Sequence, residues 1–529
     1  MRIPPGVSES DYTEALQQFE NVVGVDNVYI EDADLDLYRD AYSILWDEPE
    51  EPIAAGAIAP LNVEEVQAVV RIANQYKIPL YAISTGRNLG YGGSAPVYSG
   101  SVILDLKRMN RVIEINEAEH YCIVEPGVSF FDLYAEFERR NIKLKASMPA
   151  PGWGSPIGNA LDHGRGGPAG DNFRNSSGME VVLGDGRLIR TGMGALPGGK
   201  TWATFPVGVG PTLDGIFSQS NFGIVTKMGF NLFPWPETTR RIGIATRNYD
   251  NLDAMVAVCN ELQAMGVGGG SGVFSPLHQV LASRGQEPRS HTTTELNRLA
   301  ADFDTDLIAM NLAFSGPDKV TQAQFEVAYD MLAAAVPDAN LREFPVSRAP
   351  SSHTTATDRD SGIIGKPNLQ RFWEDTAQYD WDGHMWFSPL MPQTGEEFRR
   401  SMEVFGAICR EEDVFWGLPP ALLYNSTNMG AAASCYCIVK NFNVSKTDKA
   451  YNRRTLATSK RLIRAAAENG WSEYRGAAAL QEEIMDTFSF NDHAYMRFCE
   501  TVKDAIDPNG ILSAGRYGIW PKHLRENEA

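Results

Sequence analysis

Helical and strand-like spacings of apolar residues alternate through the first part of the chain. Between residues 62 and 76, valine and isoleucine recur three and four positions apart, which predicts an amphipathic helix. The apolar run at 78–83 reads as a buried strand, and residues 101–128 read as short strands separated by turns. Residues 129–142 return to helical spacing, with Ser129 as the N-cap. This alternation predicts an α+β segment that ends near residue 235.

The sequence PWPE at 234–237 marks a change of character along the chain. Beyond it, residues 251–266 and 321–338 have helical spacing, whereas residues 306–316 read as a strand. We therefore expect a second α+β unit after this break. The long polar stretch at 347–368 within it is either a lid or a mobile loop.

Composition limits the class of protein. A chain of 529 residues is long for one hydrophobic core, so we expect two domains. The formal net charge of -20 argues against a nucleic-acid or anionic-membrane partner. The six cysteines form neither a CxxC motif nor a cluster with zinc spacing, and MRIPPGVSES lacks the apolar core of a signal peptide. We predict a reduced cytoplasmic protein without a metal site or a membrane-spanning helix.

The sequence ISTGRNLGYGG at 83–93 concentrates glycine directly after a predicted strand. Glycine lets the backbone approach an anion closely and present several N–H groups to it. The loop lacks the ending of a P-loop and is followed by strand-like residues, so by itself it is either a phosphate cradle or a packed turn. Two further glycine-rich stretches, at 151–172 and 218–230, favour an extended ligand with a central pyrophosphate.

A series of motifs in one order makes a more specific case. It comprises STGRNLGYGGSAP, GSVILDLKRMNRVIEIN, VEPGVSFFDLY, GNALDHG, GMEVVLGDGRLIRTGMGALPG, GPTLDGIFSQSNFGIVTKMGF, GHMWFSP, EYR and DPNGILSAGRYGI. The series resembles the vanillyl-alcohol-oxidase and p-cresol methylhydroxylase family of FAD enzymes. The resemblance implies a PCMH-type FAD-binding domain at 1–237, a cap or substrate domain at 238–473, and a C-terminal segment at 474–529 that returns to the first domain. It also implies FAD as the cofactor and a homo-oligomer.

The resemblance further implies which residues hold the cofactor. His384, in DGHMWFSP, matches the histidine that bonds covalently to the flavin ring, although by itself it is one of eight histidines, in a strand beside Trp381 and Trp386. The other implied FAD-binding residues lie in the glycine-rich stretches and near the C-terminus: Ser84, Thr85, Gly86, Arg87, Asn88, Leu89, Gly90, Gly92, Pro149, Gly152, Gly154, Ser155, Gly158, Asn159, Gly223, Ile224, Val225 and Arg516.

The resemblance assigns Tyr91, Tyr474 and Arg475 to binding of a substrate phenol oxygen. A phenol has a pKa of about 10, but loss of hydride from its para carbon is driven by the phenolate. One guanidinium and two phenol hydroxyls form an anion hole that stabilises this charge. Without the resemblance, Tyr474 and Arg475 read as a surface pair before a helix.

Three positions depart from the family pattern. Ala150 stands where several oxidases of the family carry an aspartate that serves as the active-site base, and an alanine accepts no proton. Asp162 and Asp171 lie on the same glycine-rich stretch and are other carboxylates to consider. The sequences GGPAGDN at 166–172 and ALLYNSTNMG at 421–430 also differ from relatives. Smaller groups at the first of these two stretches indicate a roomier pocket and a bulkier 4-substituted phenol, such as one derived from lignin.

The implied reaction is hydride transfer from the benzylic carbon of a para-substituted phenol to flavin N5, which leaves a p-quinone methide. Molecular oxygen or a separate electron carrier then reoxidises the flavin. One alternative is a dehydrogenase that passes electrons to a cytochrome. A second is a flavin oxidase of sugars or hydroxy acids on the same fold. A third, invited by Ala150, is a degenerate protein that binds FAD or a phenol without turnover.

Overall fold

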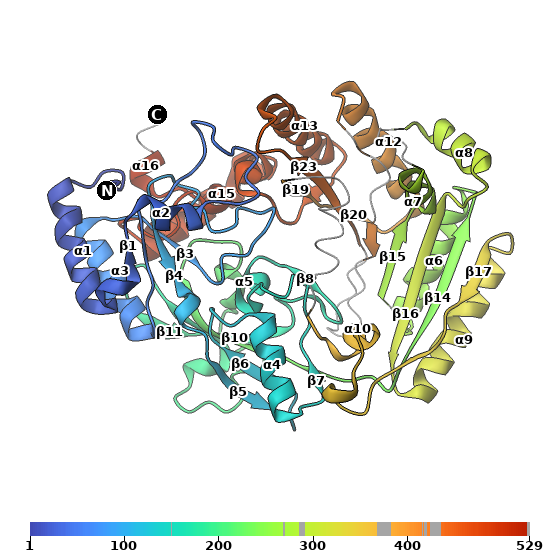
Figure 1. The fold of residues 1–529 in the computed structure, drawn as a ribbon, viewed down its shortest axis with the longest axis horizontal. Helices are drawn as coiled ribbons and strands as arrows, with labels where there is room; N and C mark the ends of the chain where they lie inside the picture. The colour runs from blue at the N-terminus through green and yellow to red at the C-terminus, as the bar shows by residue number, and fades with distance from the viewer. Residues whose placement is uncertain are drawn as a thin grey trace.

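The computed structural model describes residues 1–149, 151–267, 270–284, 291–367, 382–414, 416, 421–423 and 435–525. Figure 1 shows two groups of sheets and helices, one formed by the N-terminal half of the chain and one by the residues after it. The C-terminal helix α15 (Phe490–Ile506) lies against the N-terminal group. The fold is a mixture of helices and strands, as the spacing of apolar residues predicts.

Two sheets form the N-terminal half. The four-stranded sheet has the order β1, β2, β4, β3, and its strands span Val28–Tyr29, Gly56–Ile58, Val102–Asp105 and Leu80–Ile83. The five-stranded sheet has the order β11, β10, β12, β6, β5, and its strands span Leu188–Arg190, Ser176–Val182, Ile224–Asn231, Tyr121–Val124 and Val112–Asn116. The accompanying helices are α1 (Glu9–Val23), α3 (Val63–Tyr76), α4 (Phe130–Arg140) and α5 (Pro156–Leu161).

Local sequence explains where these helices begin and end. Helix α3 starts after Asn62, whose side chain accepts a hydrogen bond from the Glu65 N–H, and it ends at Lys77 in the left-handed region. The valines that predict this helix are buried against the four-stranded sheet. Helix α4 starts with a capping box formed by Ser129 and Asp132, which confirms the predicted N-cap.

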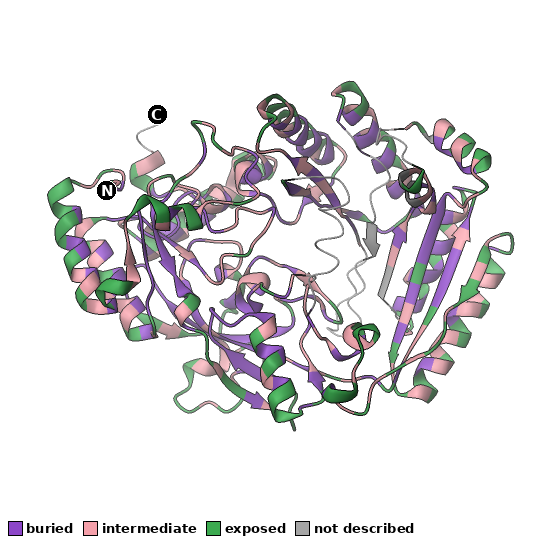
Figure 2. Cartoon of the chain, viewed as in Figure 1, coloured by how far each residue is buried: buried purple, intermediate pink, exposed green. Residues whose placement is uncertain are grey.

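A larger sheet dominates the second half. Its order is β17, β14, β16, β15, β21, β22, β20, β24, and these strands span Asn340–Glu343, Thr238–Thr246, Ile308–Gly316, Gly270–Phe274, Ala421–Leu423, Cys435–Ile438, Pro389–Pro392 and Ser472–Glu473. The helices that accompany it are α6 (Asn251–Ala264), α7 (Pro276–Ser283), α8 (Thr293–Asp302), α9 (Asp318–Ala335), α12 (Gly395–Glu411) and α13 (Lys449–Glu468). A separate pair joins β19 (Gly383–Phe387) to β23 (Lys440–Val444). Buried residues concentrate on the strands and on the inner faces of helices (Figure 2).

The polar stretch after residue 346 has more regular structure than its sequence predicts. It contains the short strand β18 (Ser347–Arg348) and the helical turn α10 (Ser361–Ile364). His353 between them is buried, with Nδ1 3.1 Å from the Tyr134 hydroxyl and Nε2 2.9 Å from the Ile142 carbonyl oxygen. Because Tyr134 belongs to α4, this stretch packs on the N-terminal half; residue 368 lies outside the described residues.

The C-terminal segment joins the N-terminal half through backbone and side-chain contacts. The Leu80 N–H donates to the Ile511 carbonyl oxygen at 2.7 Å, and Leu512 forms a parallel bridge with Leu80. Lys503, fully buried, binds Asp507 at 2.7 Å and the Asn221 carbonyl oxygen at 2.9 Å. These contacts support the division into domains at 1–237 and 238–473 with a returning C-terminal segment, which we keep as a proposal. Within the residues described, no helix is both long and apolar enough to cross a membrane.

Candidate active site

The glycine loop between β3 and β4 turns tightly around Asn88. The N–H groups of Tyr91 and Gly93 both donate to the Asn88 carbonyl oxygen, at 3.0 and 3.1 Å. Gly90 has a φ of +80°, and a Cβ built there would lie 2.7 Å from Trp386 Cδ1 and 2.9 Å from His384 Cδ2. Glycine is therefore required at this position both for the backbone angle and for the close approach of the loop to β19.

His384 lies under this loop in a closely packed aromatic environment. It occupies β19, is 4 % exposed, and packs edge-on between Tyr42 and Trp386 at centroid distances of 5.0 and 4.6 Å. Burial lowers the pKa of His384 to about 4. The imidazole is therefore neutral at neutral pH, which is the form that acts as a nucleophile.

Tyr91 is clamped between a cation and an indole. The Arg475 guanidinium carbon lies 3.8 Å from the centroid of the Tyr91 ring, and the Trp386 ring stacks at 6.2 Å with an interplanar angle of 16°. Burial raises the pKa of Tyr91 above its ordinary value, although Arg475 and a hydrogen bond with Ser388 act to lower it. Tyr91 therefore keeps its proton at neutral pH and serves as a hydrogen-bond donor.

Tyr474 and Arg475 follow directly after β24. The Gln219 side chain, from the third glycine-rich stretch, donates to the Tyr474 carbonyl oxygen at 2.8 Å. Arg475 is only 8 % exposed, so the reading of these two residues as a surface pair is wrong for its guanidinium. Burial raises the pKa of Tyr474 well above its ordinary value, and its proximity to Tyr91 raises it further. The structure thus brings Tyr91, Tyr474 and Arg475 together from positions far apart in the sequence.

Asp162 lies at the end of α5 and is surrounded by donors. Its Oδ1 lies 2.6 Å from Arg516 Nη2 and 3.2 Å from the Tyr517 hydroxyl, and its Oδ2 lies 2.7 Å from Asn88 Nδ2 and 3.4 Å from Arg475 Nη2. Burial alone raises the pKa of a carboxyl, but Arg516 and Arg475 outweigh it and hold the pKa of Asp162 below its ordinary value. This carboxylate is consequently a poor proton acceptor at neutral pH.

Asp171, the other carboxylate considered as a base, gives no better candidate than Asp162. Asp171 is buried, and its carboxylate contacts His163 Nδ1 at 3.1 Å and the Phe173 N–H at 2.9 Å. Position 150 and residues 424–434 lie outside the described residues. The structure therefore gives no account of the differences from the family pattern at Ala150 and in most of 421–430. The departure at 166–172 falls on the hairpin of β8 (Arg165–Gly166) and β9 (Gly170–Asp171).

Two charged residues of this region escaped the sequence analysis. Glu473 directly precedes the Tyr-Arg pair, and its carboxyl group accepts hydrogen bonds from the Ser388 N–H at 3.0 and 2.8 Å. Burial raises the pKa of Glu473 well above its ordinary value, and the carboxyl group lies close enough to Tyr91 to raise the pKa of that phenol as well. Arg165 in β8 hydrogen-bonds to Cys437, and its charge partly opposes the rise in the pKa of the nearby Tyr474. The EYR motif contains Glu473, but a sequence motif gives no indication that a carboxyl is buried.

The remaining residues implied to bind FAD lie in the three glycine-rich stretches and near the C-terminus. Gly158, in α5, approaches the loop so closely that a Cβ would lie 2.4 Å from Ser84 Oγ. The carbonyl oxygens of Gly152 and Gly154 accept from the first N–H groups of α4, so that stretch also supports a helix. Strand β12 begins directly after Gly223, and its first residues, Ile224 and Val225, are buried in the core. The others lie in the same loops, in α5, at the start of β12 or near the C-terminus: Thr85, Gly86, Arg87, Leu89, Gly92, Pro149, Ser155, Asn159, Ile224, Val225 and Arg516.

These residues fit a flavin cofactor. The glycine loop approaches β19 at a point where a side chain on Gly90 has no room, and the neutral His384 imidazole lies against that point. Gly158 allows a second backbone approach to the same loop at Ser84. The combination gives a backbone cradle and a nucleophilic side chain at one place, which suits a phosphate-bearing cofactor with a reactive ring.

Comparison with known proteins identifies the cofactor and the family. The model of an FAD binding domain matches residues 54–192. The 4-cresol dehydrogenase [hydroxylating] flavoprotein subunit of Pseudomonas putida is 32% identical over 531 residues, covering 98% of this chain and 97% of that protein. The chain belongs to this flavoprotein family. The 1'-carboxy-chondrochloren decarboxylase of Chondromyces crocatus is 28% identical, covering 88% of this chain and 91% of that protein.

Solved structures of the family agree with this assignment. The 4-ethylphenol oxidase from Gulosibacter chungangensis, in an isoeugenol complex, has a TM-score of 0.85 and 32% identity, covering 99% of this chain and 100% of that chain. p-Cresol methylhydroxylase with substrate bound has a TM-score of 0.86 and 29% identity, covering 98% and 99%. The fold is therefore the PCMH-type FAD-binding fold, and the chain is an FAD-dependent oxidoreductase of the phenol-oxidising family.

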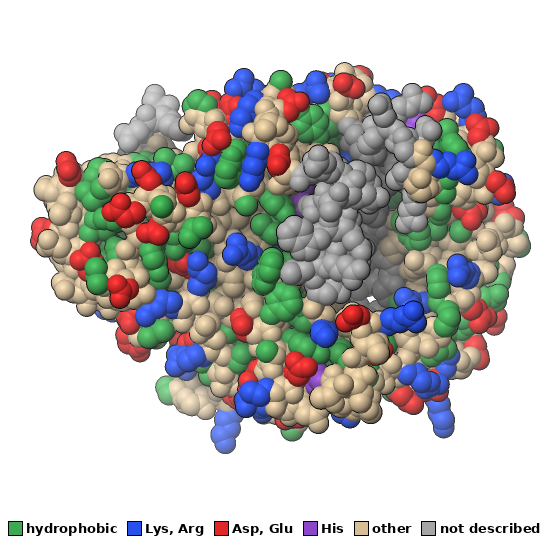
Figure 3. All heavy atoms as spheres, viewed as in Figure 1, with side chains coloured by type: hydrophobic (Ala, Val, Ile, Leu, Met, Phe, Trp, Pro, Cys, Tyr) green, Lys and Arg blue, Asp and Glu red, His purple; other side chains and the backbone are tan. Residues whose placement is uncertain are grey.

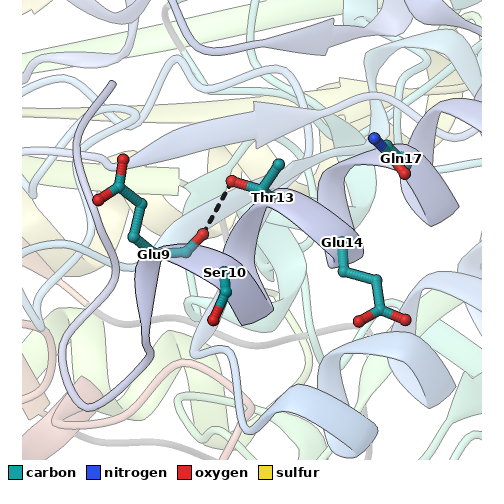
Figure 4. Close-up of a pocket in the computed structure, with 5 residues that line it drawn as sticks. All are labelled: Glu9, Ser10, Thr13, Glu14 and Gln17. Atoms are coloured by element: carbon teal, nitrogen blue, oxygen red, sulfur yellow. Dashed lines mark hydrogen bonds between the residues drawn. The ribbon is translucent and has the colours of Figure 1, made fainter.

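The molecular surface adds less information than the interior. On the face in Figure 3, acidic and basic side chains are interspersed. A shallow hollow on the outer face of α1 is lined by Glu9, Ser10, Thr13, Glu14 and Gln17, with the Thr13 hydroxyl donating to the Glu9 carbonyl oxygen at 2.8 Å (Figure 4). These residues are far from the glycine loop in the sequence and include none of the residues implied to bind FAD or phenol.

Proposed function

We propose that this enzyme oxidises para-substituted phenols at the benzylic carbon, with Tyr91, Tyr474 and Arg475 binding the phenol oxygen. The observation that carries the proposal is the convergence of these three side chains, with the buried Arg475 guanidinium stacked on Tyr91. The names of the two similar enzymes, 4-cresol dehydrogenase and 4-ethylphenol oxidase, support a 4-alkylphenol as the substrate. Bulkier phenols derived from lignin belong to the same proposal.

The proposed roles follow from the charge of each group. Arg475 is a permanent cation in a buried site, where its interaction with a phenolate is strong. Tyr91 and Tyr474 keep their protons, because burial raises both pKa values, and they donate to the same oxygen. Together they stabilise the phenolate, whose electrons assist hydride departure from the para substituent. The substrate loses one hydride and one proton and becomes a p-quinone methide, to which water adds.

The glycine loop and His384 would hold the cofactor, with His384 as the covalent attachment point. FAD, when bound there, accepts the hydride. A neutral His384 imidazole is the nucleophilic form that a bond to the flavin ring would require. Asp162 is not the base that activates water, because its carboxylate oxygens are already bound by Arg516, Tyr517 and Asn88.

The electron acceptor separates two versions of the proposal. We favour molecular oxygen, as in an oxidase. The alternative is a dehydrogenase that reduces a separate carrier, because the similar protein from Pseudomonas putida is a dehydrogenase subunit. An oxidase produces hydrogen peroxide in proportion to substrate consumed, whereas a dehydrogenase requires an added electron acceptor.

The test is anaerobic titration of the purified holoenzyme with 4-methylphenol, 4-ethylphenol, 4-hydroxybenzyl alcohol and a bulky syringyl phenol. Loss of flavin absorbance with any of them supports phenol oxidation and ranks substrate size. Readmission of air then distinguishes the acceptors, because rapid recovery of colour with peroxide formation indicates an oxidase. A flavin that none of the phenols reduces, but that a sugar or hydroxy acid reduces, contradicts the proposal.

A further inference from the structure

The Asp162 carboxylate contacts two guanidinium groups, those of Arg475 and Arg516. Asp162 Oδ1 lies 2.6 Å from Arg516 Nη2, and Asp162 Oδ2 lies 3.4 Å from Arg475 Nη2. Asp162 is 3 % exposed and Arg475 is 8 % exposed, so these charges interact with little screening by water. Arg475, directly after β24, and Arg516 both belong to the C-terminal segment, so the Asp162 side chain connects two distant positions of that segment to the N-terminal domain.

Asn88 provides a second link between Asp162 and Arg475. Its Nδ2 donates to Asp162 Oδ2 at 2.7 Å, and its Oδ1 accepts from Arg475 Nη2. An amide has one donating and one accepting end, so a carboxylate at one end requires the nitrogen to face it. The oxygen of Asn88 must then face Arg475. Asp162 therefore acts on the Arg475 guanidinium in two ways. It contacts the guanidinium directly, and it orients the Asn88 amide so that Oδ1 accepts from Arg475.

The formal charges of Asp162, Arg475 and Arg516 together suit one anionic ligand. Arg475 and Arg516 contribute two positive charges and Asp162 one negative charge, which leaves one positive charge for a ligand. Removing the carboxylate adds positive charge to the site but also removes the groups that hold Arg475. A role through charge alone and a role through position thus predict opposite changes in phenolate affinity.

We propose that Asp162 is a positioning residue that, directly and through Asn88, holds Arg475 in the orientation that binds the phenolate and ties it to Arg516. The inference rests on the proposed function, because it requires that Arg475 bind a phenol oxygen. The role proposed for Asp162 is structural support of a cation rather than proton transfer, because Arg516 already binds its carboxylate.

The experiment measures binding of 4-chlorophenol, which lacks a benzylic carbon and cannot be oxidised there. Binding to FAD-loaded protein is followed through the change in flavin absorbance between pH 6 and 9. The variants are Asp162→Asn and Asp162→Glu, with Asp171→Asn as the matched control. Asp171 is a buried carboxylate of the same stretch that contacts His163 instead of Arg475.

Asp162→Asn is expected to raise the dissociation constant of 4-chlorophenol at least tenfold at pH 8. For Asp162→Glu, the increase in the logarithm of the dissociation constant should be at most two thirds of that for Asp162→Asn. The dissociation constant of Asp171→Asn should stay within twofold of wild type. Equal or tighter binding by Asp162→Asn overturns the inference. If wild-type holoenzyme itself fails to bind 4-chlorophenol, the proposed function fails and the inference fails with it.

A second variant covers the case in which Asp162→Asn does not load FAD. Asn88→Ala leaves the contacts of Asp162 with Arg516 and Tyr517 in place and removes only the link through the amide. Weakening of 4-chlorophenol binding by at least fivefold supports the positioning role. An unchanged dissociation constant in FAD-loaded Asn88→Ala overturns positioning through Asn88 and leaves only the direct contact of Asp162 with Arg475, which Asp162→Asn tests.

Discussion

The guanidinium carbon of Arg475 lies 3.8 Å from the centroid of the Tyr91 ring. A cation over an aromatic face is stabilised by about 0.5–2 kcal/mol, depending on how far water is excluded. Because Arg475 is buried, this contact also fixes the ring of Tyr91 relative to the guanidinium. The proposed phenol site is therefore preorganised before any substrate enters, which reduces the cost of ordering it on binding.

Arg475→Ala is expected to lower kcat/KM for 4-ethylphenol by at least 100-fold, since removal of one preorganised donor to a developing charge costs about 3–4 kcal/mol. FAD content should stay at the wild-type level. Arg475→Lys keeps the charge but not the planar fork, and should recover only part of the rate. Anaerobic stopped-flow reduction of the flavin measures both variants. A reduction rate within threefold of wild type for the alanine variant would contradict the assigned role.

Gly90→Ala is expected to reduce the fraction of protein that carries flavin, because its Cβ would lie within 3.0 Å of both Trp386 and His384. Gly198→Ala is the matched control. Gly198 also has a positive φ, of +71°, but among the described residues no atom lies within 4 Å of its Cβ position. Both variants carry the same backbone strain, so a difference in flavin-to-protein absorbance ratio reports the crowding alone. Equal flavin content in the two variants is the contrary result.

The sequence predicted local elements well because their determinants are local. Helix α4 has its cap at Ser129 and its apolar spacing within one stretch, and both are found in the structure. The packing of the polar stretch after residue 346 could not be predicted, because it depends on His353 reaching Tyr134, more than 200 positions away, and no local pattern records that contact.

In the candidate active site, too, local motifs could be recognised from the sequence, whereas contacts between distant residues could not. Motifs bring Tyr91, Tyr474, Arg475 and His384 to attention, since each lies in a short recognisable stretch. The network around Asp162 joins positions 88, 162, 475 and 516, and hydrogen bonds between such distant residues follow only from the folded chain. The burial of Glu473, which raises its pKa, has the same origin.

His384→Ala is expected to leave FAD extractable by acid precipitation, whereas wild-type protein retains it in the pellet. His353→Ala is the control, because His353 is also buried but binds Tyr134 and the Ile142 carbonyl oxygen instead. With a His384 pKa of about 4, the imidazole is neutral throughout pH 6–8, so the rate of flavin attachment to apoprotein should be constant there. Release of FAD from wild type by acid would refute the covalent link.

Asp40→Asn is expected to stabilise the protein at pH 7.5 but not at pH 4. Burial raises the pKa of Asp40 to about 6, above the unfolded value of about 3.9, so the folded state favours the protonated form. Stability from this group is full below pH 4 and is lost as pH rises through 6. Asparagine stays neutral and can still accept from the Tyr42 N–H. Thermal unfolding of both proteins at the two pH values checks the sign, and a lower Tm for the variant at pH 7.5 would contradict it.

Tyr91→Phe removes a hydroxyl while the ring that packs between Arg475 and Trp386 remains. A hydrogen bond to a charged group contributes about 1.5–3 kcal/mol, so kcat/KM for 4-ethylphenol should fall at least tenfold. FAD content and Tm should stay close to wild type, because the ring contacts are kept. Tyr98→Phe, whose ring packs on Trp520 instead, is the control and should leave kcat/KM unchanged. Equal rates for the two variants would mean that Arg475 and Tyr474 bind the phenolate without Tyr91.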